Sequence, residues 1–411
     1  MRSTGQHWRT RVCVVSIALA FAMVLGAAVV AAPSAQAQTF KVLYSFTCGE
    51  DGCNPWGGLI LDSAGNLYGT DTYGCGGGGG TVFELDKAAK LTPLYCFNGN
   101  NGSPMSDLVR DAAGNLYTTT TAWVGEGPGG VFMVYKKGNG KELCFFGSKN
   151  CPEGATPWGG LVRDTAGNLY GTTAGGGPLG HGTVFKMNKA GKETVLYSFK
   201  GGKDGGGPTA SLVRDTKGNL YGTTYGAGGP PPLAASVEVR VTGKLLRGTV
   251  FMLDKTGKET VLHRFTGTGG DGANPWAGLL RDAAGNLYGT TVEGGTYGNG
   301  TVFKLDKNGK ETVLYSFTGT EGDGANPYAA LVEDAKGNLY GTTSGGGASG
   351  YGTVFEVDQT GKESVLHSFS GGRKDGSGPY GALVRDAKGN LYGTTYDGGT
   401  HRYGVVFELT P

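Results

Sequence analysis

Four short apolar runs recur along the chain, and they are clearest between residues 274 and 317. The runs are rich in Val, Leu, Tyr, Phe and Thr, are bounded by turn residues, and lie at 277–281, 286–291, 301–305 and 312–317. Runs of this length and composition predict β-strands. Val302 and Phe303 are consecutive apolar residues, whereas a strand with one face in solvent would alternate. We therefore expect sheets that are covered on both faces.

The turns between these runs predict antiparallel hairpins. Asp-x-x-Gly-Asn separates the first and second runs in all seven copies, for example from Asp282 to Asn286. An Asp at the first position caps backbone amides, and Gly supplies the left-handed residue that closes a hairpin. The segment from Asp306 to Lys310 repeats this device between the third and fourth runs.

Internal repeats extend this four-stranded unit over the whole chain. Asn-Leu-Tyr recurs at seven places, which begin at Asn66, Asn115, Asn168, Asn219, Asn286, Asn338 and Asn390. Four-stranded antiparallel sheets in radial repetition make a β-propeller, and a linear solenoid is the competing architecture.

The two ends of the repeat region favour a closed ring. Residues 40–46 read as a fourth strand without the first three, and residues 405–409 read as a third strand without a fourth. The two fragments complete one blade, and closure removes the free edges of an open array. The prediction is an all-β, seven-bladed propeller over 38–411, with an insertion at about 229–247 in the fourth repeat.

The first 37 residues have the pattern of a signal peptide. Arg2, Arg9 and Arg11 precede an apolar run at 12–32, and Ala-Gln-Ala at 35–37 offers a cleavage site. The apolar run is also long enough to span a bilayer as a retained anchor. Both alternatives place the rest of the chain outside the cytoplasm, secreted or periplasmic.

Composition and charge narrow the choice of partners. The 411 residues include 81 Gly without the three-residue period of collagen, and the 38% hydrophobic content argues against disorder. Removal of the three N-terminal arginines changes the formal net charge from +2 to −1. A nearly neutral chain has no electrostatic footprint for nucleic acid or for anionic membranes. We expect neither partner, no membrane association unless the N-terminal segment is retained, and a monomer.

The cysteines predict disulfides and not zinc. Six follow the signal segment, an even number that favours disulfides in an exported chain, and none lies in a C-x-x-C pair. The histidines are too scattered for a zinc motif. His263 and His367 replace a Tyr of the fourth strand, which predicts packing roles. The best pairings by proximity are Cys48–Cys53 and Cys144–Cys151.

The repeat also resembles a known family. The string N-L-Y-G-T-T, a Gly-rich loop and G-T-V-F-x-L-D-x-x-G-K-E-T-V-L-Y-S-F are similar to the GloVer tandem-repeat family of exported bacterial proteins. This resemblance implies an exported protein with no established activity, and often a C-terminal surface anchor. The chain ends at Pro411 directly after the last strand, so free secretion is expected. More distantly, G-L-x-x-D-x-x-G-N-L-Y resembles NHL and gluconolactonase-like propellers. The latter would imply a metal held by carboxylates in the channel, and no Asp or Glu pattern marks such a site.

Chain direction places the fourth-to-first loops and the Gly-rich second-to-third loops on one face, where a binding site is expected. The residues that follow the loop prolines form a ring of seven: Trp56, Met105, Trp158, Thr209, Trp276, Tyr328 and Tyr380. Five of these seven residues are aromatic. At the mouth of the channel, the aromatic rings could stack on sugars. The alternative is that each ring wedges between neighbouring blades as core.

Two further features lie on the same face. Asp271, Asp323 and Asp375, with Asp51 and Asp204, could hold calcium or simply cap Gly-rich turns. In the fourth repeat, the alternating run 236–241 could extend a hairpin above the site or be a tolerated insertion.

No nucleophile elbow, zinc-protease motif or phosphate loop occurs in the sequence. The expected function is a secreted, non-enzymatic binding or scaffold propeller without a required cofactor, whose ligand is an extracellular glycan or a surface protein. A carbohydrate-active lyase or hydrolase that uses loop carboxylates is the alternative.

Overall fold

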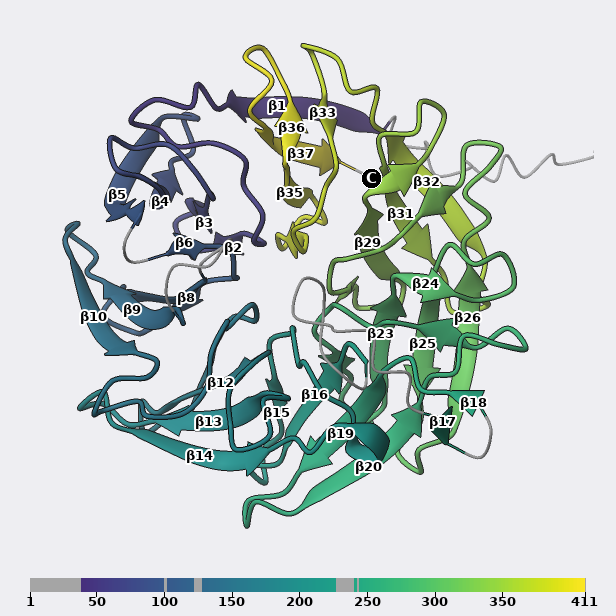
Figure 1. Cartoon of the computed structure of the whole chain (residues 1–411). Helices are drawn as coiled ribbons and strands as arrows, with labels where there is room; N and C mark the ends of the chain where they lie inside the picture. Colours follow the sequence, from purple (N-terminus) through teal and green to yellow (C-terminus); the bar gives the residue numbers. More distant parts are fainter. Residues whose placement is uncertain (1–37, 100–101, 122–127, 227–239, 242–243, 411) are drawn as a thin grey trace, which may run out of the picture. The chain divides into compact units, whose positions relative to one another are not determined.

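In the computed structural model of this protein, seven four-stranded antiparallel sheets follow one another around a ring (Figure 1). The predicted seven-bladed β-propeller is therefore confirmed. The structure describes residues 38–99, 102–121, 128–226, 240–241 and 244–410. Among the elements that lie wholly within these ranges, the 3-10 turn η2, Gly202–Asp204, is the only helical one. The blades are numbered 1 to 7 in chain order.

Each blade runs from its first strand, beside the channel, to its outer strand. Blades 1 to 3 are β2 (Ile60–Leu61), β3 (Leu67–Thr70), β4 (Gly78–Leu85), β5 (Leu91–Asn98); β7 (Val109–Arg110), β8 (Leu116–Thr121), β9 (Gly130–Val134), β10 (Gly140–Phe145); and β11 (Val162–Arg163), β12 (Leu169–Thr173), β13 (Thr183–Met187), β14 (Glu193–Ser198). Blades 4 and 5 are β15 (Val213–Arg214), β16 (Leu220–Thr224), β19 (Thr249–Leu253), β20 (Glu259–Arg264); and β22 (Leu280–Arg281), β23 (Leu287–Thr291), β25 (Thr301–Leu305), β26 (Glu311–Ser316). Blades 6 and 7 are β28 (Val332–Glu333), β29 (Leu339–Thr343), β31 (Thr353–Val357), β32 (Glu363–Ser368); and β34 (Val384–Arg385), β35 (Leu391–Thr395), β37 (Val405–Thr410), β1 (Thr39–Ser45).

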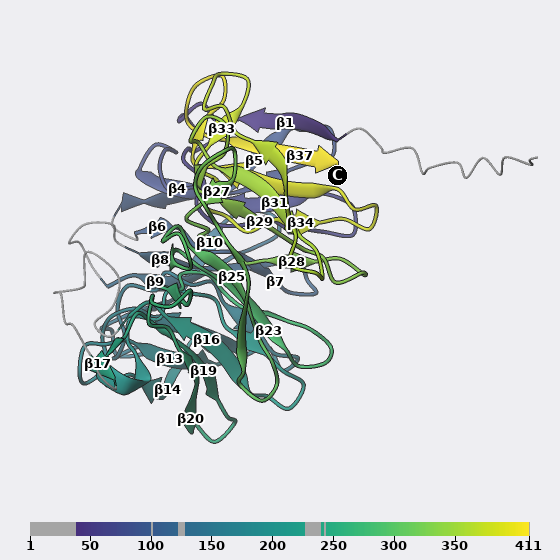
Figure 2. The ribbon, with the colours of Figure 1, turned by 90° about the vertical axis from the view of Figure 1, so that its right-hand side faces the viewer.

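The ring is closed by the two ends of the repeat region. β1 pairs antiparallel with β37 from Thr39 opposite Thr410 to Ser45 opposite Val405. The two strands lie side by side in both views (Figures 1 and 2). β1 is thus the outer strand of blade 7, as predicted, and Gln38–Pro411 form one compact unit.

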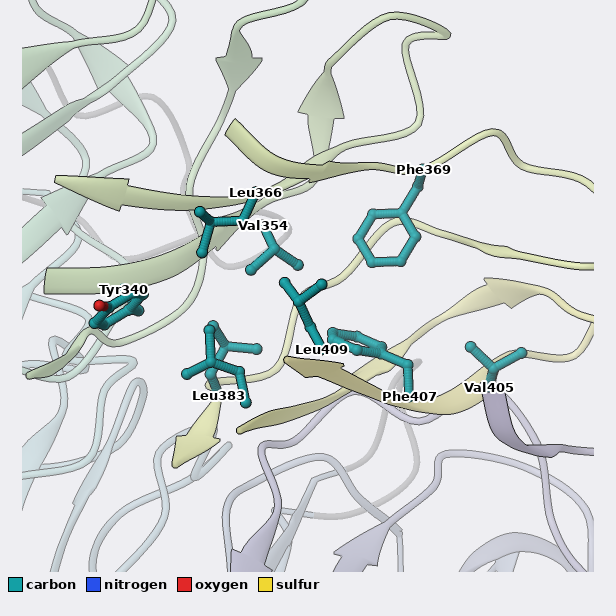
Figure 3. Packing of buried hydrophobic residues seen from close by; sticks show 9 residues of the cluster. Tyr340, Val354, Leu366, Phe369, Leu383, Val405, Phe407 and Leu409 are labelled. Atoms are coloured by element: carbon teal, nitrogen blue, oxygen red, sulfur yellow. The ribbon is translucent and has the colours of Figure 1, made fainter. Parts of the chain in front are cut away.

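The hydrophobic core lies between neighbouring blades in seven separate clusters. At each boundary, a Phe at the end of an outer strand or directly after it packs against the third-strand Phe of the next blade, with ring centroids 5.0–5.4 Å apart. Figure 3 shows Phe369 and Phe407 in the cluster between blades 6 and 7. Because each blade covers its neighbour's face, consecutive residues of one strand are buried on opposite sides, as Val302 and Phe303 are.

The first strands pair over fewer residues than the sequence predicted. In blade 5 only Leu280–Arg281 pairs with β23, although the apolar run begins at residue 277. Near the axis, the backbone oxygen of Ala277 instead accepts a 3.1 Å hydrogen bond from the Thr223 hydroxyl of blade 4. Equivalent threonine bonds cross every blade boundary, and Thr394 to Gly57 completes the ring.

The Asp-x-x-Gly-Asn turns have the predicted structural role. Asp282 accepts hydrogen bonds from the backbone N–H and the amide of Asn286, and from the Tyr288 hydroxyl. Burial acts to raise the pKa of Asp282, but these hydrogen bonds outweigh it and hold the pKa below its usual value. The six equivalent aspartates accept from the corresponding Asn and Tyr in the same way.

The long loops of a blade pair with each other, which confirms that they lie on one face. In blades 5, 6 and 7 the loop before the first strand and the loop after the second strand form two-stranded sheets: β21 (Gly272–Ala273) with β24 (Glu293–Gly294), β27 (Gly324–Ala325) with β30 (Gly345–Gly346), and β33 (Gly376–Ser377) with β36 (Asp397–Gly398). In blade 2, β6 (Ser103–Pro104) pairs with β8. In the insertion, β17 (Arg240–Val241) pairs with β18 (Lys244–Leu245), while the predicted strand residues 236–239 lie outside the described residues.

Three disulfides join all six cysteines of the propeller. Cys48–Cys53 and Cys144–Cys151 are the pairs that proximity favoured, with Cα atoms 4.6 and 6.0 Å apart. Cys75–Cys96, with a Cα separation of 5.7 Å, was not among the predicted pairs. Disulfides persist in oxidising compartments, so the three bonds indicate an exported protein. The predicted signal segment lies outside the described residues.

Candidate functional site

The seven ring residues predicted from the repeats meet around the mouth of the axial channel. All of them line one cavity: Trp56, Met105, Trp158, Thr209, Trp276, Tyr328 and Tyr380. None belongs to the seven interblade clusters. The five aromatic side chains are half-buried, whereas Met105 and Thr209 are buried. The ring residues therefore lie outside the interblade hydrophobic clusters, and neighbouring rings contact one another across blade boundaries.

The five aromatic residues form one continuous arc. Trp158 packs edge-on against Trp276, Trp276 against Tyr328, and Tyr328 against Tyr380, with centroids 5.4–5.8 Å apart. Tyr380 stacks flat on Trp56 at 4.4 Å with 6° between the planes. Trp158 and Trp276 belong to blades 3 and 5 and meet across blade 4, whose ring residue is the small Thr209. The Thr209 hydroxyl donates to the backbone oxygen of Trp276.

Two tyrosines that directly follow second strands pack against the arc. Tyr225 packs edge-on against Trp276, and Tyr396 packs against both Trp56 and Tyr380. Burial raises the pKa of Tyr328 and of Tyr396 to about 12, so both hydroxyls stay neutral near pH 7. This second row was not predicted from the sequence. Its signal was the aromatic residue that follows Gly-Thr-Thr in blades 4 and 7.

The cavity between the ring side chains is small, and a carboxylate lies in its wall. Its volume of about 60 Å³ has room for a few water molecules. Asp107 lines it, one residue beyond Ser106, at a position where the other blades have Gly, Ala or Ser. Burial raises the pKa of Asp107, although the Gly58 N–H donates to its carboxylate at 2.6 Å. This residue was not predicted from the repeat pattern.

The acidic residues of the fourth-to-first loops do not form a ring of carboxylates. Asp323 accepts from the Thr318 N–H and from the Tyr315 hydroxyl of its own blade. Asp271 and Asp375 cap the corresponding loops and lie beside His263 and His367. Within the described residues, no cluster of potential metal ligands combines Asp271, Asp323 and Asp375. These contacts match the turn-capping alternative, and the calcium ring is not supported.

Further aromatic residues stand on the Gly-rich loops themselves. Tyr297, Tyr351 and Tyr403 follow the second strands of blades 5, 6 and 7, and 41–60% of each residue is exposed. The sequence signal was a Tyr close to the Gly that precedes Thr-Val-Phe or Val-Val-Phe. Because the second-to-third loops carry them, these residues lie on the same face as the arc.

The comparisons with known proteins identify the repeat. The model of the Gloeobacter/Verrucomicrobia repeat matches residues 25–230 and 239–411. The chain belongs to this family. The resemblance stated from the repeat motifs is thereby confirmed. No curated protein matches the sequence.

Solved structures similar to this family member share its fold. The extracellular domain of a hybrid two-component system from B. thetaiotaomicron aligns with 91% of this chain at 15% identity and a TM-score of 0.56. The extracellular domain of a one-component system from the same organism aligns with 90% at 12% identity and a TM-score of 0.57. This chain covers 41% and 40% of those two chains.

A gluconolactonase from Xanthomonas campestris aligns with 72% of this chain and 82% of its own, at 15% identity. Its TM-score of 0.43 supports no functional conclusion. In the part of the repeat protein that the structure describes, no helix has the length and apolarity needed to cross a bilayer.

Proposed function

We propose that this propeller is an extracellular binding module that holds a glycan on the face carrying the Gly-rich loops. The observation that carries the proposal is the continuous arc of five half-exposed aromatic rings at the channel mouth. Trp and Tyr rings offer flat apolar faces, and the ring faces of sugars are apolar as well.

The shape and charge of the site favour a neutral ligand that lies across the arc. A cavity of about 60 Å³ cannot admit a sugar ring, so the ligand would contact the outer surface of the aromatics. The arc itself carries no charged side chain, and its tyrosines are neutral near pH 7, since burial raises their pKa further above the ordinary value of 10. A neutral polysaccharide satisfies both conditions. The similarity to extracellular domains of bacterial signalling systems is compatible with a binding role.

The test is retention of the protein on a panel of immobilised polysaccharides. Trp276→Ala, Tyr328→Ala and Tyr380→Ala each remove a contact worth about 1.5–3 kcal/mol, which corresponds to a loss of affinity of roughly tenfold or more. Because these rings lie outside the interblade clusters, the melting temperature should change little. Tyr135→Ala is the matched control, since Tyr135 is an exposed aromatic of the third-to-fourth turn on the opposite face.

Two results would contradict the proposal. Equal retention of the wild type and of a variant that combines Trp276→Ala, Tyr328→Ala and Tyr380→Ala would show that the arc is not the binding site. A large fall in melting temperature without a change in retention would make the arc structural. Incubation of the protein with the same polysaccharides also tests for catalysis, because new reducing ends would support the lyase or hydrolase alternative.

A further inference from the structure

A second group of polar side chains recurs at the outer ends of the blade boundaries. In blade 5, the outer-strand Tyr315 donates to Asp323 of the following loop, and Glu363 of blade 6 faces this pair across the boundary. Blades 3 and 4 repeat the arrangement with Tyr197, Asp204 and Glu259. The repeated unit is thus a phenol and two carboxylates, supplied by two neighbouring blades.

At the boundary between blades 4 and 5 a histidine replaces the phenol. His263 Nε2 lies 3.4 Å from Asp271 Oδ1, and Glu311 of blade 5 completes a cluster whose ligand atoms all lie within 4.8 Å of one another. The side chains of His263 and Asp271 are 19% and 17% exposed. Glu311 Oε1 is buried and has no hydrogen-bond partner among the described residues.

We propose that His263, Asp271 and Glu311 bind a divalent transition-metal ion, with Zn²⁺ as the probe, and thereby join blade 4 to blade 5. One imidazole nitrogen and two carboxylate oxygens are a donor set that suits zinc, with water in the remaining position. In a tetrahedral site with bonds of about 2.0–2.1 Å, neighbouring ligand atoms are roughly 3.3 Å apart. The observed separations therefore need only small side-chain movements.

Charge and access support the same assignment. The cluster contains two carboxylates, Asp271 and Glu311, whose oxygen atoms lie within 4.8 Å of each other. A dication would offset the repulsion between the two carboxylates, and the unpartnered oxygen of Glu311 would bind it. Asp271 and Glu311 also line a surface groove along β26, which gives an ion a path from solvent.

The cluster was not predicted from the sequence because zinc motifs are recognised by ligands that lie close together along the chain. His263 and Asp271 come from one repeat and Glu311 from the next. The other outer-strand histidine lacks this environment. His367 lies 3.3 Å from Asp375, but Phe40 of β1 stacks on its ring at 3.8 Å, and Phe40 occupies the strand position that Glu311 has in blade 5.

The experiment is calorimetric titration of the metal-free protein with Zn²⁺, together with melting curves with and without the ion. We expect one Zn²⁺ per chain and a melting temperature that rises with Zn²⁺ concentration. His263→Tyr restores the phenol–carboxylate pair of blades 3 and 5, so its fold should be preserved. This variant and Glu311→Gln should each weaken binding by about tenfold or more. His367→Tyr is the matched control and should bind like the wild type.

Three outcomes would overturn the assignment. The wild type could fail to bind Zn²⁺ at concentrations that saturate ordinary protein zinc sites. His263→Tyr and Glu311→Gln could bind as tightly as the wild type. His367→Tyr could lose binding to the same extent as His263→Tyr. Melting of each variant in chelator shows separately whether it is folded.

Discussion

The glycine of Leu-Tyr-Gly-Thr illustrates how one residue identity is set by packing inside a blade. In β23, a Cβ on Gly289 would lie 2.7 Å from the ring of Phe303 and 3.0 Å from Leu279. Gly289 itself has an ordinary strand conformation, so its missing side chain serves close approach and not a turn. Five other blades have Gly at this position against their own third-strand Phe. Blade 2 has Thr118, whose hydroxyl lies 3.0 Å from the hydroxyl of Ser106, a position where the other blades have Gly or Ala.

Glu363 gives a prediction of pH dependence at the same scale. Burial and the nearby Asp323 raise the pKa of this glutamate from 4.5 to about 7. The folded state therefore binds its proton more tightly than the unfolded state. This contribution to stability is fully present below the unfolded pKa, near 4.5, and is lost as the pH rises through about 7. Glu363→Gln should flatten the fall of the unfolding free energy in this window, by less than the limit of about 1.4 kcal/mol per pH unit because solvent screens the half-exposed carboxylate.

Denaturant unfolding at a series of pH values measures this slope. Glu142→Gln is the control, because Glu142 is exposed on β10. An identical slope in Glu363→Gln and the wild type would show that Glu363 is not the group that titrates.

At the scale of elements, β1 holds three blades together. It pairs with β37 of blade 7, and Phe40 packs on His367 and Phe369 of the blade 6 outer strand. Phe46, directly after β1, packs on Phe83 of blade 1. A strand from one end of the chain therefore contributes both the outer edge of the last blade and the boundary with the first.

Deletion of residues 38–46 should consequently open the ring. It exposes the edge of β37 and removes Phe46, whose loss alone is expected to cost about 3–5 kcal/mol. The deletion should therefore lower the unfolding free energy by more than a single core truncation does. A chain that lacks only residues 1–37 is the control, and calorimetry measures both. Equal melting temperatures for the two chains would exclude closure by β1.

At the scale of the whole molecule, the covalent links are confined to one part of the ring. The three disulfides lie between residues 48 and 151, in blades 1 and 2 and the loops that flank them. Cys144 occupies the strand position of the Tyr or His of other blades, opposite Val131 as Tyr315 is opposite Val302. The bond from Cys144 to Cys151 therefore takes the place of the hydrogen bond between outer strand and loop.

Reduction should thus loosen the molecule unevenly. A disulfide that closes a loop of about 20 residues stabilises by roughly 3 kcal/mol, and the later blades have none. After reduction, amide hydrogen exchange should accelerate in residues 48–151 and change little in blades 5 and 6. Before reduction, alkylation followed by mass spectrometry should label none of the six cysteines. Labelling of all six, or uniform acceleration around the ring, would contradict this prediction.

The sequence by itself determined the blades, their number and their closure. The turns of Asp282 and Asp306, the consecutive apolar residues at Val302 and Phe303, and the incomplete units at the two ends are local patterns that report strand pairing directly. It also placed the five aromatic residues on one face, because chain direction assigns each loop to an end of its blade.

The contacts between blades were decided only by the tertiary structure. Trp158 meets Trp276 across the blade that contributes Thr209, Asp107 lines the channel, and Glu311 joins His263 and Asp271 from the preceding repeat. Repeat spacing shows that such residues occupy related positions, but it does not give their separation. That separation depends on how closely the first strands converge at the axis and on how neighbouring blades pack, which is set by interblade rings such as Phe317 and Phe355.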